Sequence, residues 1–452
     1  MTILSRSLIA SAGSGAASVS YWVARVTTSP NLENSYRAAV NEADETIIVR
    51  TSTQSSADQG YIELDYDGGY QSAKTTAMAS VGSSGYQASI ECVGGKTYIA
   101  NQSTYYNARI LERESASDTT YTSRGFSLYG ILGFQNTVAH SHFLCADEET
   151  ADDRLVFVGG GYSSEDYGYT VYQPRFVALT WNTSTLNIDS YQGIQGSPNL
   201  EGYGSRWAQV AKGNNQKFAV TWTDTASTMH GFATYYNGAT PSFIGALYPS
   251  SANMKNLGIG IDANDKMSAV TGVSNQCWVF RGNTAGVYTP NVYYIFDPSS
   301  IGGYPMSAAF DSEGNAYILT REMYLIKFNT LNQIEWTLYL DNTQTTYQSA
   351  EGLSEVKVET IGDTEFLLLS LQYPPESTTR PGYIVKAPLD LNNYLGTYGN
   401  LQISLASFNP TVYSSSAGAT GFYDRQTPTI GKFSESITAS SSGATSSATV
   451  ID

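Results

Sequence analysis

The segment MSAAFDSEGNAYILTREMYLIKFNTLNQIEWTLYL, residues 306–340, decides the fold class. It divides into four predicted strands, over residues 307–310, 316–320, 324–328 and 334–340. These stretches contain Tyr, Ile, Phe and Thr, residues that suit a half-buried pleated surface. Between the first two strands stands Asp-Ser-Glu-Gly-Asn, whose Gly and Asn tolerate the positive φ of a tight hairpin turn. The segment is therefore predicted to be one unit of four short antiparallel strands.

The same four-strand plan recurs along the chain. The first hairpin turns of the predicted units lie near Asp44, Gly95, Asp152, Asn214, Asn264, Gly314 and Asp363. Successive turns are about 50 to 60 residues apart, which matches β-propeller blades and is too long for hexapeptide β-helix repeats. We therefore predict an all-β fold, a β-propeller of about seven four-stranded blades over residues 21–407.

The two ends of the chain differ from the repeats. The strand-like residues 21–26 resemble the fourth strand of the 306–340 unit, so we expect them to complete the blade that the last repeat begins. The alternative is that residues 401–407 take that place and residues 21–26 attach elsewhere. Residues 1–20 are predicted to form a flexible N-terminal arm, and residues 408–452 a flexible, Ser/Thr/Ala-rich C-terminal extension. Either arm is a candidate attachment segment.

Composition and charge exclude several classes of function. The net charge is -16 with only 24 Lys and Arg, which argues against nucleic acid or an anionic membrane as a partner. No stretch approaches the roughly 18 consecutive apolar residues of a membrane span, so membrane insertion is not expected. Cys92, Cys145 and Cys277 lack the spacing of a zinc site or a disulfide framework and are expected to be buried free thiols.

A family resemblance rests on seven residues of the 306–340 unit. They are Asp311, Gly314, Asn315, Tyr317, Lys327, Asn329 and Trp336. Their order resembles the bacterial and viral β-propeller repeat family, in which D-x-x-G-N-x-Y is followed by a Tyr-x-x-Lys-x-(Asp/Asn) strand and a Trp-bearing strand. The segment IELDYDGGYQSAK, residues 62–74, resembles it less fully, and the remaining units have lost much of the motif.

The composition and layout of the whole chain also resemble those of structural proteins of tailed bacteriophages. A short N-terminal arm precedes divergent Tyr/Ser/Thr/Gly-rich repeats with few cysteines. This resemblance implies a non-enzymatic virion component, such as a tail, fibre or capsid-associated protein, without a cofactor. It also implies assembly with other virion proteins in a symmetric oligomer and contact with a host-surface glycan or protein. The alternatives are a bacterial surface or periplasmic adhesive propeller and a propeller hydrolase or lyase, because the fold hosts all three.

A tyrosine-rich stretch is the leading candidate for a binding site. Residues 162–172 contain Tyr162, Tyr167, Tyr169 and Tyr172. Tyrosine offers a flat apolar ring and a polar hydroxyl at low entropic cost, which suits sugars and protein surfaces. The alternative is that these rings only cover an edge of the propeller.

Two weaker candidates concern metal ions. His140 and His142 form an H-x-H pair that regular strand alternation would place on one face, although a third ligand is missing and ordinary strand histidines are the alternative. Closely spaced carboxylates in turns invite calcium, and solvated hairpin turns are the alternative. The turn candidates are Asp65 with Asp67, Asp262 with Asp265, and the acidic residues of 147–153. No motif of a catalytic site was found in the sequence, and none is assigned.

Overall fold

A computed structural model describes most of the repeat region and parts of the C-terminal extension. The described residues are 21–29, 35–52, 58–77, 89–104, 107–113, 120–127, 137–147, 154–166, 170–182, 187–195, 205–212, 217–224, 230–236, 242–247, 254–264, 266–273, 276–284, 291–296, 305–342, 354–373, 382–406, 411–416, 419–420, 424–426, 432–438 and 445–451. Within them the chain is almost entirely β-structure, with one short 3₁₀ helix, η2 (Leu391–Asn393).

The described strands assemble into seven antiparallel sheets, numbered 1 to 7 along the chain. Sheet 1 contains β2 (Ser35–Asn41), β3 (Thr46–Ser52), β4 (Asp58–Asp65) and β5 (Tyr70–Ala77). Sheet 2 contains β6 (Ile90–Val93), β7 (Lys96–Thr104), β8 (Asn107–Arg113), β9 (Thr120–Ser127) and β34 (Lys432–Thr438). Sheet 3 contains β10 (Thr137–Asp147), β11 (Arg154–Asp166), β12 (Thr170–Asn182), β13 (Asn187–Gln195) and β33 (Asp424–Gln426). Sheet 4 contains β14 (Ser205–Lys212), β15 (Lys217–Asp224), β16 (His230–Tyr236), β17 (Ser242–Leu247) and β32 (Ala419–Thr420).

The other three sheets follow the same plan. Sheet 5 contains β18 (Met254–Ile261), β19 (Lys266–Val273), β20 (Gln276–Thr284), β21 (Asn291–Phe296) and β31 (Thr411–Ser416). Sheet 6 contains β22 (Pro305–Phe310), β23 (Ala316–Thr320), β24 (Tyr324–Phe328), β25 (Ile334–Asn342), β30 (Leu401–Leu405) and β29 (Gly396–Tyr398). Sheet 7 contains β26 (Glu355–Ile361), β27 (Thr364–Gln372), β28 (Gly382–Pro388), β1 (Trp22–Ser29) and β35 (Thr445–Ile451).

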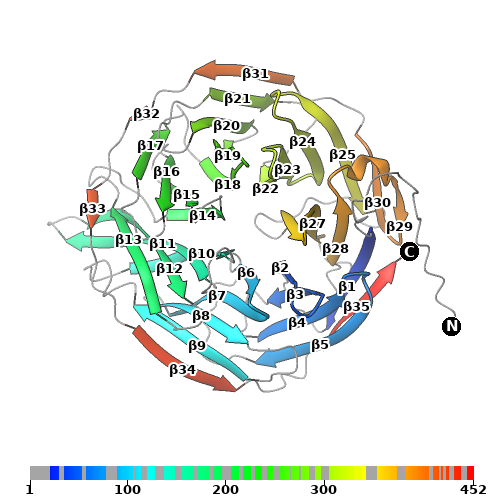
Figure 1. Ribbon diagram of the computed structural model, residues 1–452, viewed down its shortest axis with the longest axis horizontal. Helices are drawn as coiled ribbons and strands as arrows, with labels where there is room; N and C mark the ends of the chain where they lie inside the picture. Colours follow the sequence, from blue (N-terminus) through cyan, green and yellow to red (C-terminus); the bar gives the residue numbers. More distant parts are fainter. Residues whose placement is uncertain are drawn as a thin grey trace.

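The sheets stand around a common centre, as in a β-propeller (Figure 1). The first strand of each sheet contacts the first strands of the sheets on both sides, and β26 contacts β2, so the ring is closed. Each of the seven predicted turns lies between the first and second strands of its sheet. Gly314 has φ +90° and closes its turn through an amide that donates to the Asp311 carbonyl, a conformation that favours glycine. The predicted all-β propeller class is therefore confirmed.

The apolar core lies between neighbouring sheets. On β27, Leu367 and Leu369 belong to the cluster shared with sheet 6, whereas Phe366 and Leu368 belong to the cluster shared with sheet 1. Successive strand residues point to opposite faces, so a strand buried on both faces needs a continuous apolar run. This requirement explains the sequence Phe-Leu-Leu-Leu in the middle of β27.

Strand β1 closes the ring. It pairs antiparallel with β28, with Trp22 opposite Lys386 and Val26 opposite Gly382. The expectation that residues 21–26 complete the last blade is therefore confirmed. The alternative for residues 401–407 is wrong, because β30 pairs with β25 of sheet 6 instead.

The described parts of the C-terminal extension form paired strands instead of the flexible arm that its composition predicts. Its strands β31 to β35, which we call the perimeter strands, pair with the outer strands β21, β17, β13, β9 and β1. They visit the sheets in the reverse of chain order and surround much of the ring (Figure 1). Backbone pairing at exposed sheet edges needs few apolar side chains, so a Ser/Thr-rich sequence can form these strands. The predicted N-terminal arm, residues 1–20, lies outside the described residues.

Candidate functional site

The tyrosine-rich stretch forms the hairpin between β11 and β12. Tyr162 stands opposite Pro174, and Tyr172 stands opposite Ser164. Tyr167 and Tyr169 lie in residues 167–169, outside the described part of the chain. The hairpin joins the two longest strands that the structure describes, each of 13 residues, and Tyr162 and Tyr172 lie toward its end of sheet 3.

The histidine pair lies on β10, where the ladder is irregular. The pairing register with β11 shifts between Ala139 and His142. The prediction that His140 and His142 share one face assumes a regular ladder, and this shift interrupts that regularity. Over the residues that the structure describes, no group of three His, Cys, Asp or Glu residues is placed to hold a metal ion.

Two of the acidic turns use their carboxylates to bind backbone amides. Asp262 Oδ1 accepts from the amides of Asn264 and Lys266, both at 2.8 Å. Asp65 Oδ1 accepts from the Gly69 amide at 2.5 Å. These bonds stabilise hairpin turns. They agree with the alternative to calcium binding, in which the carboxylates belong to ordinary hairpin turns. Asp265 and residues 148–153 lie outside the described residues.

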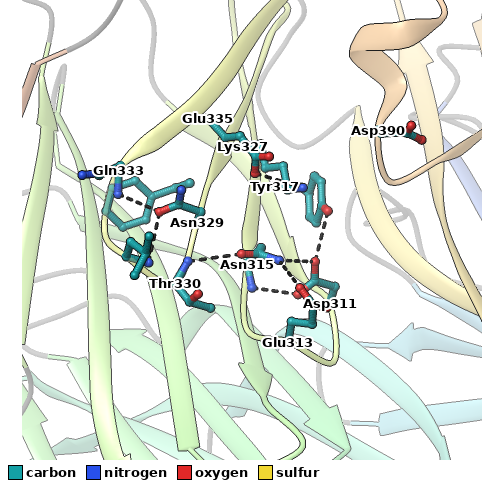
Figure 2. Close-up of polar contacts among 12 residues, drawn as sticks. Asp311, Glu313, Asn315, Tyr317, Lys327, Asn329, Thr330, Gln333, Glu335 and Asp390 are labelled. Carbon is teal, nitrogen blue, oxygen red and sulfur yellow. Dashed lines mark hydrogen bonds and ion pairs between the residues drawn. The ribbon is translucent and has the colours of Figure 1, made fainter.

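The first turn of the 306–340 unit is held by one buried carboxylate. Asp311 Oδ1 accepts from the Asn315 amide at 2.7 Å, and Asp311 Oδ2 accepts from Asn315 Nδ2 at 2.8 Å and from the Tyr317 hydroxyl at 3.1 Å (Figure 2). Asn315 Oδ1 in turn accepts from the Thr330 amide at 3.2 Å, which connects this turn to the turn between β24 and β25. Residues that carry the family resemblance thus form an internal network of contacts in one sheet.

Lys327 and Trp336 join this network through their contacts with Tyr317. Lys327 Nζ lies 3.1 Å from Glu335 Oε2 and 5.7 Å from the centre of the Tyr317 ring. The Trp336 ring lies 6.1 Å from that of Tyr317. Because burial and the neighbouring Asp311 carboxylate raise the pKa of Tyr317, its hydroxyl stays protonated and donates to Asp311. The motif therefore identifies a structural turn and carries no exposed reactive group.

Polar contacts also connect neighbouring sheets at these turns. The Ser312 amide and hydroxyl donate to the two carboxylate oxygens of Glu365, at 2.9 and 2.7 Å, which connects sheet 6 to sheet 7. Arg281 of sheet 5 donates to the Gly314, Phe328 and Asn329 carbonyls of sheet 6. Its planar guanidinium presents several donors in a fixed geometry that matches these carbonyls.

The densest charged group of the described chain lies on the innermost strands. Lys357 Nζ on β26 is 2.8 Å from Glu91 Oε1 on β6, 3.2 Å from the Ile90 carbonyl and 3.5 Å from Glu359 Oε1. Arg37 Nε on β2 is 3.5 Å from Glu355 Oε1, also on β26. We call Arg37, Glu91, Glu355, Lys357 and Glu359 the inner charge cluster. It links sheets 1, 2 and 7.

Burial and mutual charge perturb this cluster. Burial raises the pKa of Glu91 to about 7, while the nearby Lys357 ammonium partly opposes the shift. Burial alone would lower the pKa of Lys357, but the carboxylates of Glu91, Glu359 and Glu355 outweigh it and raise that pKa. A proton can therefore be bound at Glu91 near neutral pH. Sequence analysis missed this cluster, although the alternation Glu-Val-Lys-Val-Glu at 355–359 placed its three charges on one strand face.

The cysteines agree with the expected buried thiols where their side chains are described. Cys92 and Cys277 are free and buried. Burial raises the pKa of Cys92 to about 12, so its thiol is not ionised at neutral pH. Among the described residues, no helix is long and apolar enough to cross a membrane.

Comparisons with known proteins concern the fold alone. No protein family and no curated protein matches the sequence. The solved Dos1 propeller is 9% identical with a TM-score of 0.44, over 81% of this chain and 94% of that one. An oligogalacturonate lyase in complex with manganese is 9% identical with a TM-score of 0.42, over 81% of this chain and 92% of that one. The Trypanosoma rangeli sialidase in complex with the inhibitor DANA is 11% identical with a TM-score of 0.34, over 81% of this chain and 58% of that one.

Proposed function

We propose that this protein is a non-enzymatic structural component of a tailed-bacteriophage virion, a tail, fibre or capsid-associated protein. The observation that carries the proposal is the closure of the ring by both ends of the chain. Strand β1 lies between β28 and β35, and the perimeter strands extend five sheets. Such a ring resists opening because its first strand is paired on both sides, which suits a part that transmits load and presents loops.

The internal polar groups support a scaffold. The Asp311 carboxylate binds its own turn, and the Glu91 and Lys357 side chains bind each other. Polar groups that are already paired contribute to rigidity and specificity of packing. The ring is thus proposed to act as a platform, and its connecting loops to make the contacts with other virion proteins in a symmetric assembly.

The proposed recognition surface is the tyrosine hairpin of sheet 3. With a net charge of -16, the protein is repelled by anionic glycans and nucleic acid. Contact through aromatic stacking and hydroxyl hydrogen bonds is the mode that remains for a neutral glycan or protein on the host surface. We assign this role to Tyr162, Tyr167, Tyr169 and Tyr172.

Location in the virion is tested by mass spectrometry of purified particles. The proposal expects the chain at a fixed copy number per particle, and that number should be a multiple of the symmetry of one substructure. Recovery only in the envelope fraction of a bacterium that carries the gene would instead establish the adhesive alternative. Immunogold labelling of intact particles would then identify the substructure that holds it.

Recognition is tested with Tyr167→Ser, Tyr169→Ser and Tyr172→Ser combined. Adsorption to host cells should fall while the unfolding midpoint stays close to that of the parent. A matched variant with Phe at the same three positions keeps the rings and removes the hydroxyls, so it separates stacking from hydrogen bonding. Normal adsorption by a stably folded Ser variant would remove this hairpin as the recognition surface.

A further inference from the structure

The turn between β4 and β5 is hydrogen-bonded to both strands that close the ring. Trp22 Nε1 on β1 donates to the Tyr66 carbonyl at 2.8 Å, and Lys386 Nζ on β28 donates to the same carbonyl at 2.9 Å. Trp22 and Lys386 stand directly opposite each other where β1 pairs with β28. Because a carbonyl oxygen has two lone pairs, this one backbone group of sheet 1 binds a strand from each end of the repeat region.

The Lys386 ammonium lies in an almost closed site with aromatic walls. Nζ is 5.3 Å from the centre of the Tyr66 ring and 5.3 Å from that of the Phe366 ring. Lys386 is only 3% exposed, and Trp22 and Phe366 belong to the apolar cluster between sheets 7 and 1. Aromatic faces attract a cation, but they replace only part of the hydration that a buried ammonium loses. We call Trp22, Tyr66, Phe366 and Lys386 the closure site.

The turn that carries Tyr66 is held in place within sheet 1. The Tyr66 amide donates to the Glu45 carbonyl at 3.2 Å, and its hydroxyl donates to the Asn41 carbonyl at 3.4 Å. Gly68 has φ +89°, and a Cβ there would fall 2.8 Å from Trp22 Cγ, so the turn lies directly against the indole. Because the turn is fixed to sheet 1, opening the closure site separates this turn from sheet 7.

We propose that the closure site is a pH-dependent switch, in which protonated Lys386 favours opening between sheets 7 and 1 and neutral Lys386 favours the closed junction. Since the side chain is almost fully buried, water reaches it only when the turn separates from sheet 7. The ammonium is therefore better solvated in the open state. The neutral amine can still donate to the Tyr66 carbonyl but has no charge to solvate. This inference goes beyond the proposed function and concerns a movement of the ring itself.

Burial sets the pH range in which the switch operates. It lowers the pKa of Lys386 from 10.5 to about 8, and the Asp67 and Asp65 carboxylates of the same turn partly oppose the shift. In the open state Lys386 regains its ordinary pKa, so the open state binds more protons between these two values. The stability that Lys386 gives to the closed site is complete above pH 10.5 and is lost as the pH falls through 8. Opening should therefore become about tenfold more frequent from pH 9 to pH 7.

Exchange of the Trp22 indole N–H with water, followed by NMR on the full-length protein, tests the switch, because this group is bonded to Tyr66 in the closed site. Trp22→Phe identifies the signal, and division by the rate of a free tryptophan amide at the same pH gives the protection factor. Relative to Lys386→Met, which is always neutral, protection in the parent should rise about tenfold from pH 7 to pH 9. Lys386→Gln is a second neutral reference, and Lys386→Arg, which is always charged, should lack the rise.

Two control variants assign the effect to Lys386. Tyr66→Phe keeps the ring and the carbonyl but removes the phenol, and Lys327→Met removes a lysine of sheet 6, so both should retain the rise. Comparison with Lys386→Met also cancels the effect of Glu91, whose pKa is about 7 and which is present in both proteins. A parent-to-Met ratio that is equal at pH 7 and pH 9, a rise that disappears in Tyr66→Phe, or a rise that persists in Lys386→Arg would each overturn the switch.

Discussion

Lys357 Nζ lies 2.8 Å from Glu91 Oε1, and this contact joins two sheets that are not neighbours in the ring. Lys357 belongs to sheet 7 and Glu91 to sheet 2, and sheet 1 stands between them. Because sheet 1 follows directly after the closing strand β1, this bond spans the junction at which the two ends of the repeat region meet. The pairing of β1 within sheet 7 closes the ring farther from its centre. The contact between Lys357 and Glu91 holds the same junction together on the innermost strands.

We expect Lys357→Met to lower the free energy of unfolding by about 1 to 3 kcal/mol, because it leaves Glu91 and Glu359 facing each other without a cation. Combining it with Glu91→Gln should restore part of the loss, with a coupling energy above about 1 kcal/mol in a double-mutant cycle. The matched pair Lys327 and Glu335 lies 3.1 Å apart, but the Glu335 side chain is 47% exposed. Its cycle should give less than about 1 kcal/mol, and equal coupling in both pairs would contradict the closing role.

The same pair predicts a pH dependence. Burial raises the pKa of Glu91 from 4.5 to about 7. The folded protein therefore retains a proton that the unfolded chain releases between these values, and the resulting stability is fully present below pH 4.5 and lost as the pH rises through 7. Urea unfolding at successive pH values should show that Glu91→Gln removes this decline, worth up to about 3 kcal/mol. Lys357→Met should extend the decline to higher pH, because Lys357 lowers the pKa of Glu91. An unchanged pH profile in both variants would exclude Glu91 as its source.

The Asp311 carboxylate predicts a large local effect on stability. It is almost fully buried and accepts three hydrogen bonds, from the Asn315 amide, Asn315 Nδ2 and the Tyr317 hydroxyl. Asp311→Ala should cost about 2 to 4 kcal/mol in the free energy of unfolding, since the buried donors lose their acceptor. Asp390 makes a matched control, because it accepts from Asn393 Nδ2 in an exposed turn. Asp390→Ala should change stability by no more than about 0.5 kcal/mol, and a comparable loss in both variants would contradict this account.

Much of the fold could be predicted from local sequence signals. Strand boundaries in the 306–340 unit agree with the structure to within about two residues. The reason is that Asp311, Gly314 and Asn315 fix the first turn by contacts within that turn. Strand β1 was recognised because its Trp-bearing pattern matches that of another fourth strand, Trp336 included.

The perimeter strands and the inner charge cluster could not be predicted in the same way. Strand β34, KFSESIT, pairs through its backbone with β9, and a Ser/Thr-rich sequence carries no periodic apolar signal for that pairing. The partners Glu91 and Lys357 are 266 residues apart in the chain. Their contact depends on how the ring closes, and this is a property of the whole fold.

The perimeter strands predict a specific pattern of amide exchange. Removing residues 439–452 deletes β35, whose only described ladder partner is β1. In an antiparallel sheet, alternate amides of a central strand bond to the neighbour on each side. The amides of β1 that bond to β35 should therefore exchange faster by about tenfold or more, while those that bond to β28 stay protected. Removing residues 407–452 should extend the effect to β21, β17, β13 and β9, which pair with the other perimeter strands. The ring itself should remain closed in both truncations, because β1 still pairs with β28. Residue-resolved exchange by fragmentation mass spectrometry measures this alternation directly, and β1 amides that exchange uniformly, or not faster at all, would show that β35 does not pair there in solution.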